Sequence, residues 1–119
     1  YLYEFTWKTP VLGGMLKTPH TLCIPFVFGT VDVAEAFTGT GPEQAALSEK
    51  VMGAWLAFVR TGDPNHAGLP KWDTFDARTR PTMIFDNQAV VENDPKPEDR
   101  AGINKCPPFV SDMQWSAPD

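Results

Sequence analysis

The stretch between Thr40 and Gly62 constrains the fold more than any other part of the sequence. Its apolar side chains recur at helical spacing and form a wide stripe: Leu47, Val51, Met52, Trp55, Leu56, Phe58 and Val59. The opposite face carries Ser48, Glu49, Lys50, Gly53 and Arg60. Because residues three and four apart share one helix face, this pattern predicts an amphipathic helix of about twenty residues, near 42–61.

Both ends of this helix carry residue types that start or stop helices. The segment Thr40-Gly41-Pro42-Glu43 has the form of a capping box, in which the Thr40 hydroxyl and the Glu43 carboxylate each satisfy a backbone N–H. Gly62 is typical of the position just past a helix end. A stripe this wide must pack on a large surface, and little else in the sequence offers one.

Shorter segments around the helix favour strands. Tyr1, Tyr3, Phe5 and Trp7 alternate along the first seven residues, which predicts a strand buried on at least one side. Residues 82–86 and 89–93 flank Asn87-Gln88 and predict a hairpin whose register stays open, because the turn lacks glycine. Residues 24–29 are apolar and β-prone, but Pro25 argues against a central strand there.

The last part of the sequence predicts one more short element. Asp94 is expected to cap a helix that reaches about Asn104, with Pro95 at its first position. Beyond Cys106-Pro107-Pro108 the tail is expected to be frayed. We interpret the acidic residues between 92 and 99 as a solvated surface, with calcium binding as the less favoured reading.

Composition excludes several classes of protein. The chain has 119 residues, 42% of them hydrophobic and 21% charged, which is typical of one soluble globular domain. A net charge of −5 and a pI near 4.9 argue against binding to nucleic-acid phosphates. No apolar run approaches the roughly 18 residues that a membrane span needs. No signal peptide is visible, and the compartment stays open.

Two histidines and two cysteines are the residues that invite a chemical role. His20 lies in a loop before the apolar segment, and His66 lies in a polar loop where we expect an ordinary solvated side chain. A zinc site built from these histidines with Cys23 and Cys106 is disfavoured, because structural zinc ligands usually come in closely spaced pairs. One disulfide is possible at most, and whether the cysteines pair stays open. Trp55 and Phe58 are expected in the core.

Several ordered motifs resemble one enzyme family. Tyr1–Phe5 and Pro19-His20-Thr21-Leu22-Cys23-Ile24-Pro25-Phe26-Val27-Phe28-Gly29 are similar to the histidine segment of type-B carboxylesterases, which include cholinesterases and para-nitrobenzyl esterases. Residues 54–65, with Gly62-Asp63-Pro64-Asn65, then Leu69-Pro70-Lys71-Trp72 and Met83-Ile84-Phe85-Asp86, match its later markers in order. The resemblance covers roughly residues 1 to 95.

The resemblance implies an α/β fold, specifically the C-terminal part of an α/β-hydrolase domain with a serine–acid–histidine triad. The triad histidine comes last in chain order, and His20 matches it. Ser48, Ser111 and Ser116 lack the Gly-x-Ser-x-Gly setting, so the serine and acid are expected upstream of Tyr1. Residues 1–119 are therefore expected to be one C-terminal fragment of a single domain. The twelve prolines and the absence of an initiating Met fit a fragment.

The implied activity is hydrolysis of a small carboxylic ester through an acyl-enzyme, without cofactor or metal, with no nucleic acid and no membrane span. Alone, the chain is expected to be inactive. The alternative is a non-catalytic cholinesterase-like adhesion or binding protein. One residue departs from the family, which usually has Glu three residues after the histidine where this chain has Cys23. A neutral thiol lacks the charge that would favour imidazolium, so the tuning of His20 is in doubt.

Overall fold

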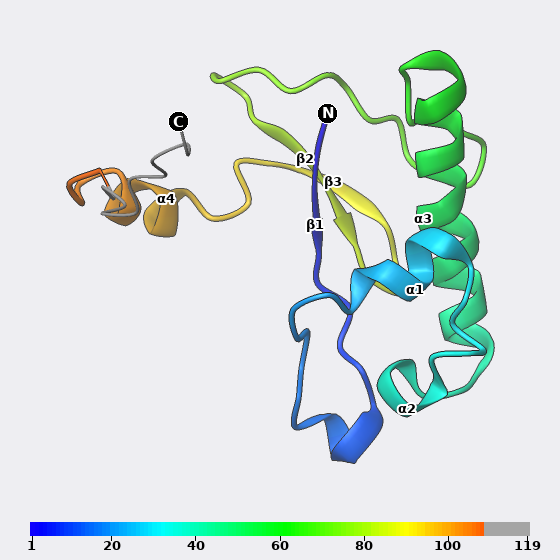
Figure 1. Ribbon diagram of the computed structural model, residues 1–119. Coiled ribbons are helices and arrows are strands. Elements are labelled where there is room, and N and C mark those ends of the chain that lie inside the picture. The colour runs from blue at the N-terminus through cyan, green and yellow to red at the C-terminus, as the bar shows by residue number, and fades with distance from the viewer. Residues whose placement is uncertain (109–119) are drawn as a thin grey trace, which may run out of the picture.

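The computed structural model describes residues 1–108, in which a small mixed sheet packs against helices (Figure 1). Strand β1 (Leu2–Phe5) pairs in parallel with β2 (Pro81–Phe85), and β2 pairs antiparallel with β3 (Val90–Asn93). Parallel neighbours need a long crossover connection, and here residues 6–80 supply it. The sheet and its crossover helices confirm the predicted α/β class.

The crossover holds a short 3₁₀ segment, η1 (Val11–Gly14), and three α-helices, α1 (Cys23–Phe28), α2 (Glu35–Thr38) and α3 (Pro42–Thr61). Helix α4 (Pro97–Ile103) follows β3. Among residues 1–108 no helix combines the length and apolar character needed to cross a membrane. The predicted frayed tail, beyond Pro108, lies outside the described residues.

Helix α3 has the predicted bounds but not the predicted cap. Its N-cap is Gly41, which has φ 154° and no side-chain cap, and Pro42 takes the first helical position. Thr40 therefore lies one residue too early for a capping box, and that prediction is wrong. At the other end Gly62 adopts φ 78° and donates its N–H to the Phe58 carbonyl at 2.7 Å. The predicted stop is confirmed.

The face that α3 buries is rotated from the predicted one. Leu47, Val51 and Ala54 are buried, and so is Ser48, whose hydroxyl donates to the Phe26 carbonyl at 3.0 Å. Trp55 is 42% exposed and Phe58 is 48% exposed, so the expectation that both lie in the core is wrong. Helix α1 packs on the turns of α3 that carry the buried residues, and the aromatic side of the stripe receives no comparable cover.

The β-prone segment after His20 is a helix. Cys23–Phe28 forms α1, ends at Gly29 with φ 65°, and buries Phe26 completely. Pro25 sits in the first turn, where a backbone N–H has no helical partner, so its missing donor costs little. This position explains why a proline fits an apolar segment that could not have been a central strand.

The strands agree with the sequence-based predictions more closely than the helices do. Tyr3 and Phe5 face the helices, where Tyr3 meets Trp55 and Phe5 meets Phe26 in tilted or edge-on ring contacts. The hairpin is confirmed, and Ile84 pairs with Val90, which puts Asn87 at the midpoint of the turn. Helix α4 begins at Pro97 rather than Pro95, because the Asp94 carboxylate binds Arg100 instead of capping a helix.

Candidate functional site

His20 lies on the loop that leaves the carboxyl end of β1 and leads into α1. Because β1 and β2 run in parallel, their carboxyl ends share one edge of the sheet. In open α/β sheets this edge is where ligands bind. The His20 side chain is exposed to solvent there.

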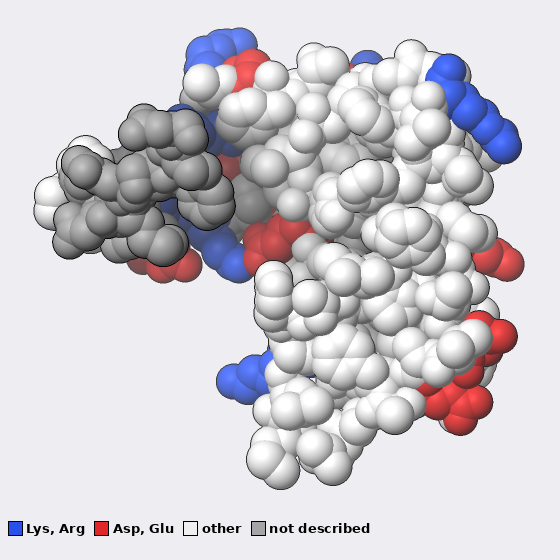
Figure 2. Space-filling model, viewed as in Figure 1, with Lys and Arg blue, Asp and Glu red and all other residues white. Residues whose placement is uncertain are grey.

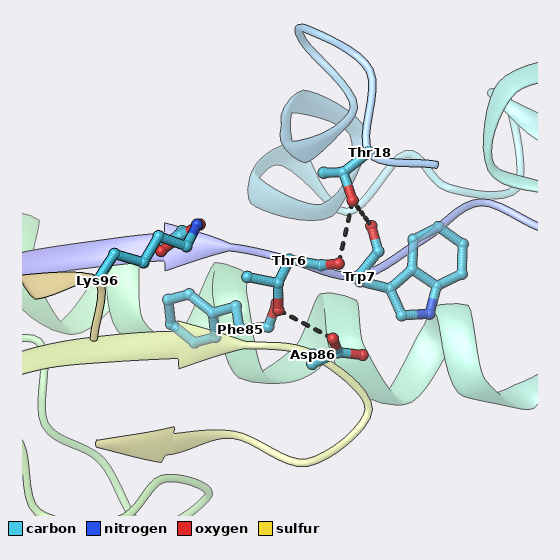
Figure 3. A network of polar contacts seen from close by, with 7 residues as sticks. Thr6, Trp7, Thr18, Phe85, Asp86 and Lys96 are labelled. Carbon is cyan, nitrogen blue, oxygen red and sulfur yellow. Dashed lines mark hydrogen bonds and ion pairs between the residues drawn. The ribbon is translucent and has the colours of Figure 1, made fainter. Parts of the chain in front are cut away.

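Thr18 fastens this loop to the end of β1. Its hydroxyl donates to the backbone carbonyls of Thr6 at 3.0 Å and Trp7 at 2.8 Å (Figure 3). The Thr9 N–H also donates to the Lys17 carbonyl at 3.0 Å. The residues before His20 are therefore tied to the strand end through side-chain and backbone bonds.

The residues after His20 are held from the other side. Leu22 is buried in the core, and its N–H donates to the Pro19 carbonyl at 3.2 Å, closing a tight turn around His20. Thr21 has φ 72°, an uncommon conformation for a β-branched residue, and its hydroxyl donates to the His20 carbonyl at 2.5 Å. Such local strain persists where surrounding packing fixes the backbone, and functional loops often show it.

A second pair of residues links the two strand ends. The Thr6 hydroxyl donates to the Asp86 carboxylate at 2.9 Å (Figure 3). The Thr6 N–H donates to the Phe85 carbonyl at 2.9 Å. Together with Thr18 they make a continuous network from β2 to the histidine loop. Thr6 and Asp86 lie inside the predicted strands, whereas in the structure each directly follows the end of β1 or β2, and sequence reasoning missed their role.

The chemistry available at this edge is that of one accessible imidazole. An imidazole ring can accept a proton and return it. Within residues 1–108 no carboxylate forms an ion pair with the His20 ring. The same part of the chain has no group of three or more His, Cys, Asp or Glu that could hold a metal ion, and Cys23 and Cys106 are both free thiols.

His66 is not the solvated side chain that the sequence suggested. Its ring is half-buried, with Nε2 at 3.1 Å from the Lys50 carbonyl and Nδ1 accepting the Gly68 N–H at 3.1 Å. Since Nδ1 accepts, Nε2 must carry the proton and donate to Lys50. The histidine therefore holds the loop after α3 against the helix through hydrogen bonds, which is a structural role.

The Asp-Pro-Asn and Pro-x-Trp motifs also have a structural role, because Asn65 of the first is hydrogen-bonded to the backbone of Trp72 in the second. The Asn65 side chain donates to the Trp72 carbonyl and accepts from the Trp72 N–H, both at 2.7 Å. Asp63 accepts from the Asn65 N–H at 2.9 Å, and this bond is the main cause that lowers the pKa of the Asp63 carboxyl. Asn65 thus acts as a bridge that keeps Trp72 buried.

Comparisons with known proteins agree on one group of relatives. The family model described as the carboxylesterase family matches residues 1–101. Para-nitrobenzyl esterase of Bacillus subtilis (strain 168) is 35% identical over an alignment of 102 residues that covers 84% of this chain and 20% of that protein. Phenmedipham hydrolase of Pseudarthrobacter oxydans is 37% identical over an alignment of 97 residues that covers 77% of this chain and 20% of that protein.

Solved structures give the same result. A carboxylesterase of Geobacillus stearothermophilus superposes with a TM-score of 0.70 and 38% identity, covering 85% of this chain and 21% of that one. A structure titled PNB esterase gives a TM-score of 0.73 and 31% identity, covering 93% of this chain and 22% of that one. The chain thus spans about a fifth of the length of the relatives that it matches.

Proposed function

This chain belongs to the carboxylesterase family, and on that premise we propose that it supplies the histidine base of a serine esterase that hydrolyses small carboxylic esters. The observation that carries the proposal is the placement of His20. It is accessible at the shared carboxyl edge of β1 and β2, and the Thr18 bonds and the buried Leu22 fix its loop on both sides.

The role proposed for His20 follows from ester chemistry. A serine hydroxyl attacks a carbonyl well only when a base removes its proton, and the imidazole then returns that proton to the leaving alkoxide. Water attacks the acyl-enzyme by the same route. The serine and the acidic residue would come from sequence other than residues 1–119, and no cofactor takes part.

The test uses a chimera in which this chain replaces the matching segment, about a fifth of the length, of the Bacillus subtilis para-nitrobenzyl esterase. We expect the chimera to hydrolyse p-nitrophenyl esters, and His20→Ala to lower its kcat by about 10²–10⁴-fold, the usual value of general acid–base assistance. The isolated chain should release no p-nitrophenol beyond the background of free imidazole.

Two results would contradict the proposal. Saturable turnover by the isolated chain would show that it carries a complete site of its own. A folded chimera whose turnover is unchanged by His20→Ala would remove His20 from the mechanism. His66→Ala serves as the matched control, because His66 is bound to the backbone of Lys50 and Gly68 and should leave kcat unchanged.

A further inference from the structure

A small cavity lies where the segment around α2 meets the start of α3, and it shares no lining residue with the His20 loop. Its volume is about 170 Å³, and its lining includes the acidic residues Asp32 and Glu35 together with Gly41 and Gln44. Among the described residues no Lys or Arg lines it. Carboxylates only accept hydrogen bonds or bind cations, so this lining favours a positively charged occupant.

The amide of Gln44 provides an independent observation. Gln44 is only 2% exposed, and its Nε2 donates to the Thr38 carbonyl at 3.2 Å. This bond fixes which end of the amide is the nitrogen, because an amide oxygen cannot donate to a carbonyl. The other end, Oε1, is buried and has no hydrogen-bond partner within residues 1–108. Buried acceptors in folded proteins almost always have a partner, so an unpaired one points to a bound water or ion.

Gly41 shows that this oxygen points toward the cavity. A Cβ at position 41 would lie 2.9 Å from Gln44 Oε1. Gly41 itself lines the cavity, so Oε1 faces the space that a side chain at this position would fill. Any residue other than glycine would cover the oxygen from that side.

The charges around the cavity also favour a cation. Figure 2 shows acidic side chains at the lower right of the face drawn, near α2 and the start of α3, with no basic side chain among them. Within residues 1–108 neither Asp32 nor Glu35 forms an ion pair. The N-terminus of α3 carries a partial positive charge, and Glu43 in its first turn offsets it.

We propose that this cavity is a calcium site. Ca²⁺ binds about six to eight oxygen atoms from carboxylates, amides, backbone carbonyls and water, and it tolerates irregular geometry. Asp32 and Glu35 would supply the negative charge, Gln44 Oε1 a neutral oxygen, and water the remaining ligands. The site differs from a cluster of three or more His, Cys, Asp or Glu, because only two of its side-chain donors are carboxylates. Mg²⁺ fits less well, since it demands nearly ideal octahedral geometry.

The ion would have a structural role. It would join the segment around α2 to the first turn of α3 and provide the partner that the buried amide oxygen lacks. Because the cavity shares no residue with the His20 loop, the inference goes beyond the proposed function and does not depend on it.

The test is a titration of the 119-residue chain with CaCl₂, followed by ¹H–¹⁵N NMR. We expect the backbone amides of residues 31–45 and the side-chain amide of Gln44 to shift along one saturable curve. The expected Kd is about 10⁻⁴–10⁻³ M, the range of weak calcium sites. MgCl₂ should bind at least about tenfold more weakly, because the site lacks octahedral order. NaCl at the same ionic strength should leave these signals nearly unchanged.

Two charge-matched double variants separate a site from general attraction to an acidic chain. Asp32→Asn with Glu35→Gln should raise the Kd for calcium by at least about tenfold, because affinity follows the number of charged ligands. Glu92→Gln with Glu98→Gln removes the same charge from exposed residues on β3 and α4. This control should change the Kd by less than about twofold, since distant exposed charges are screened by salt.

Gln44→Met tests the buried oxygen, because it keeps a side chain of similar length and removes the amide. We expect its Kd to rise by at least about tenfold as well, measured against the calcium-free spectrum of the same variant. Three results would overturn the proposal. These are shifts that do not saturate, equal losses of affinity in the two double variants, and calcium binding by Gln44→Met that matches the wild type.

Discussion

At the scale of single residues, the position of His20 depends on Thr18. Its hydroxyl bonds to two backbone carbonyls at the end of β1, and the described chain offers no second side chain that does this for the histidine loop. A catalytic histidine must be held to within a fraction of an ångström, since small displacements of a reacting group lower rates strongly. Under the proposed function, Thr18 is therefore a positioning residue rather than a catalytic one.

Replacing Thr18 with Val keeps the shape and removes both bonds. We expect kcat of the chimera to fall by about tenfold or more with little change in KM, because misplacement of the base affects the transition state. Steady-state kinetics with a p-nitrophenyl ester measure both constants. Thr9→Val is the control, because the Thr9 hydroxyl donates to the Phe37 carbonyl and so anchors the loop elsewhere. Equal losses of kcat in the two variants would show that loop stability alone matters.

At the scale of elements, His66 couples α3 to the loop that follows it. Gly53 is an interior residue of α3, and a Cβ at this position would lie 2.9 Å from His66 Nε2. The ring could move away only by giving up its bond to the Lys50 carbonyl. The glycine therefore leaves room for a histidine from the next loop.

This contact predicts that Gly53→Ala does not stabilise the protein as a Gly→Ala change inside a helix usually does. Gly→Ala inside a helix normally stabilises by about 1 kcal/mol, but here Gly53→Ala should give no gain or a loss. In a His66→Ala background the same change should recover the normal gain. Urea unfolding of the four proteins of this double-mutant cycle measures the coupling. A full gain from Gly53→Ala in the wild-type background would contradict the contact.

The bridge from Asp63 to Asn65 and Trp72 predicts a pH dependence. Hydrogen bonds from Asn65 lower the pKa of the Asp63 carboxyl in the folded chain, so the unfolded state binds the proton more tightly. The stability from this bridge is then complete above the ordinary pKa of aspartate and is lost as pH falls through the lower folded value. Comparing thermal unfolding of the wild type and Asp63→Asn from pH 7 to pH 2 should show a difference that shrinks with acid. A constant difference would exclude the carboxylate as its cause.

The elements differ in how far the sequence could predict them. The bounds of α3 could be predicted from the sequence because Pro42 and Gly62 act locally. The hairpin could be predicted because alternation and turn residues are also local signals. Helix α1 was missed because a six-residue apolar run with Ile, Val and Phe looks like a strand until its packing on α3 is known. His66 was missed because its partner is a backbone carbonyl sixteen residues away.

The candidate site shows the same division. His20 was identified through its motif, but the hydrogen bonds that hold its loop join residues that are distant in sequence. Thr18 reaches Thr6 across twelve residues, and Thr6 reaches Asp86 across eighty. The second pair follows from the parallel pairing of β1 with β2, which no local sequence pattern contains.

At the scale of the whole molecule, the chain is more extended than a compact domain of its length. Its radius of gyration is 17.2 Å, whereas a compact domain of this size has about 13 Å. Helix α3 buries Leu47, Val51 and Ala54 but leaves Trp55 and Phe58 half-exposed. The expectation that this helix lacks a matching surface therefore holds for the aromatic side of its stripe and not for the side that faces α1.

This imbalance predicts weak cooperativity on heating. A compact domain absorbs about 0.7 kcal/mol of enthalpy per residue when it unfolds near 60 °C. The isolated chain should absorb less, over a broad transition, because part of its apolar surface is already hydrated in the folded state. Differential scanning calorimetry measures the enthalpy directly, and its ratio to the van't Hoff value tests two-state behaviour. A sharp transition with the full enthalpy would contradict the expectation. It would mean that Leu47, Val51 and the sheet form a complete core although Trp55 and Phe58 stay half-exposed.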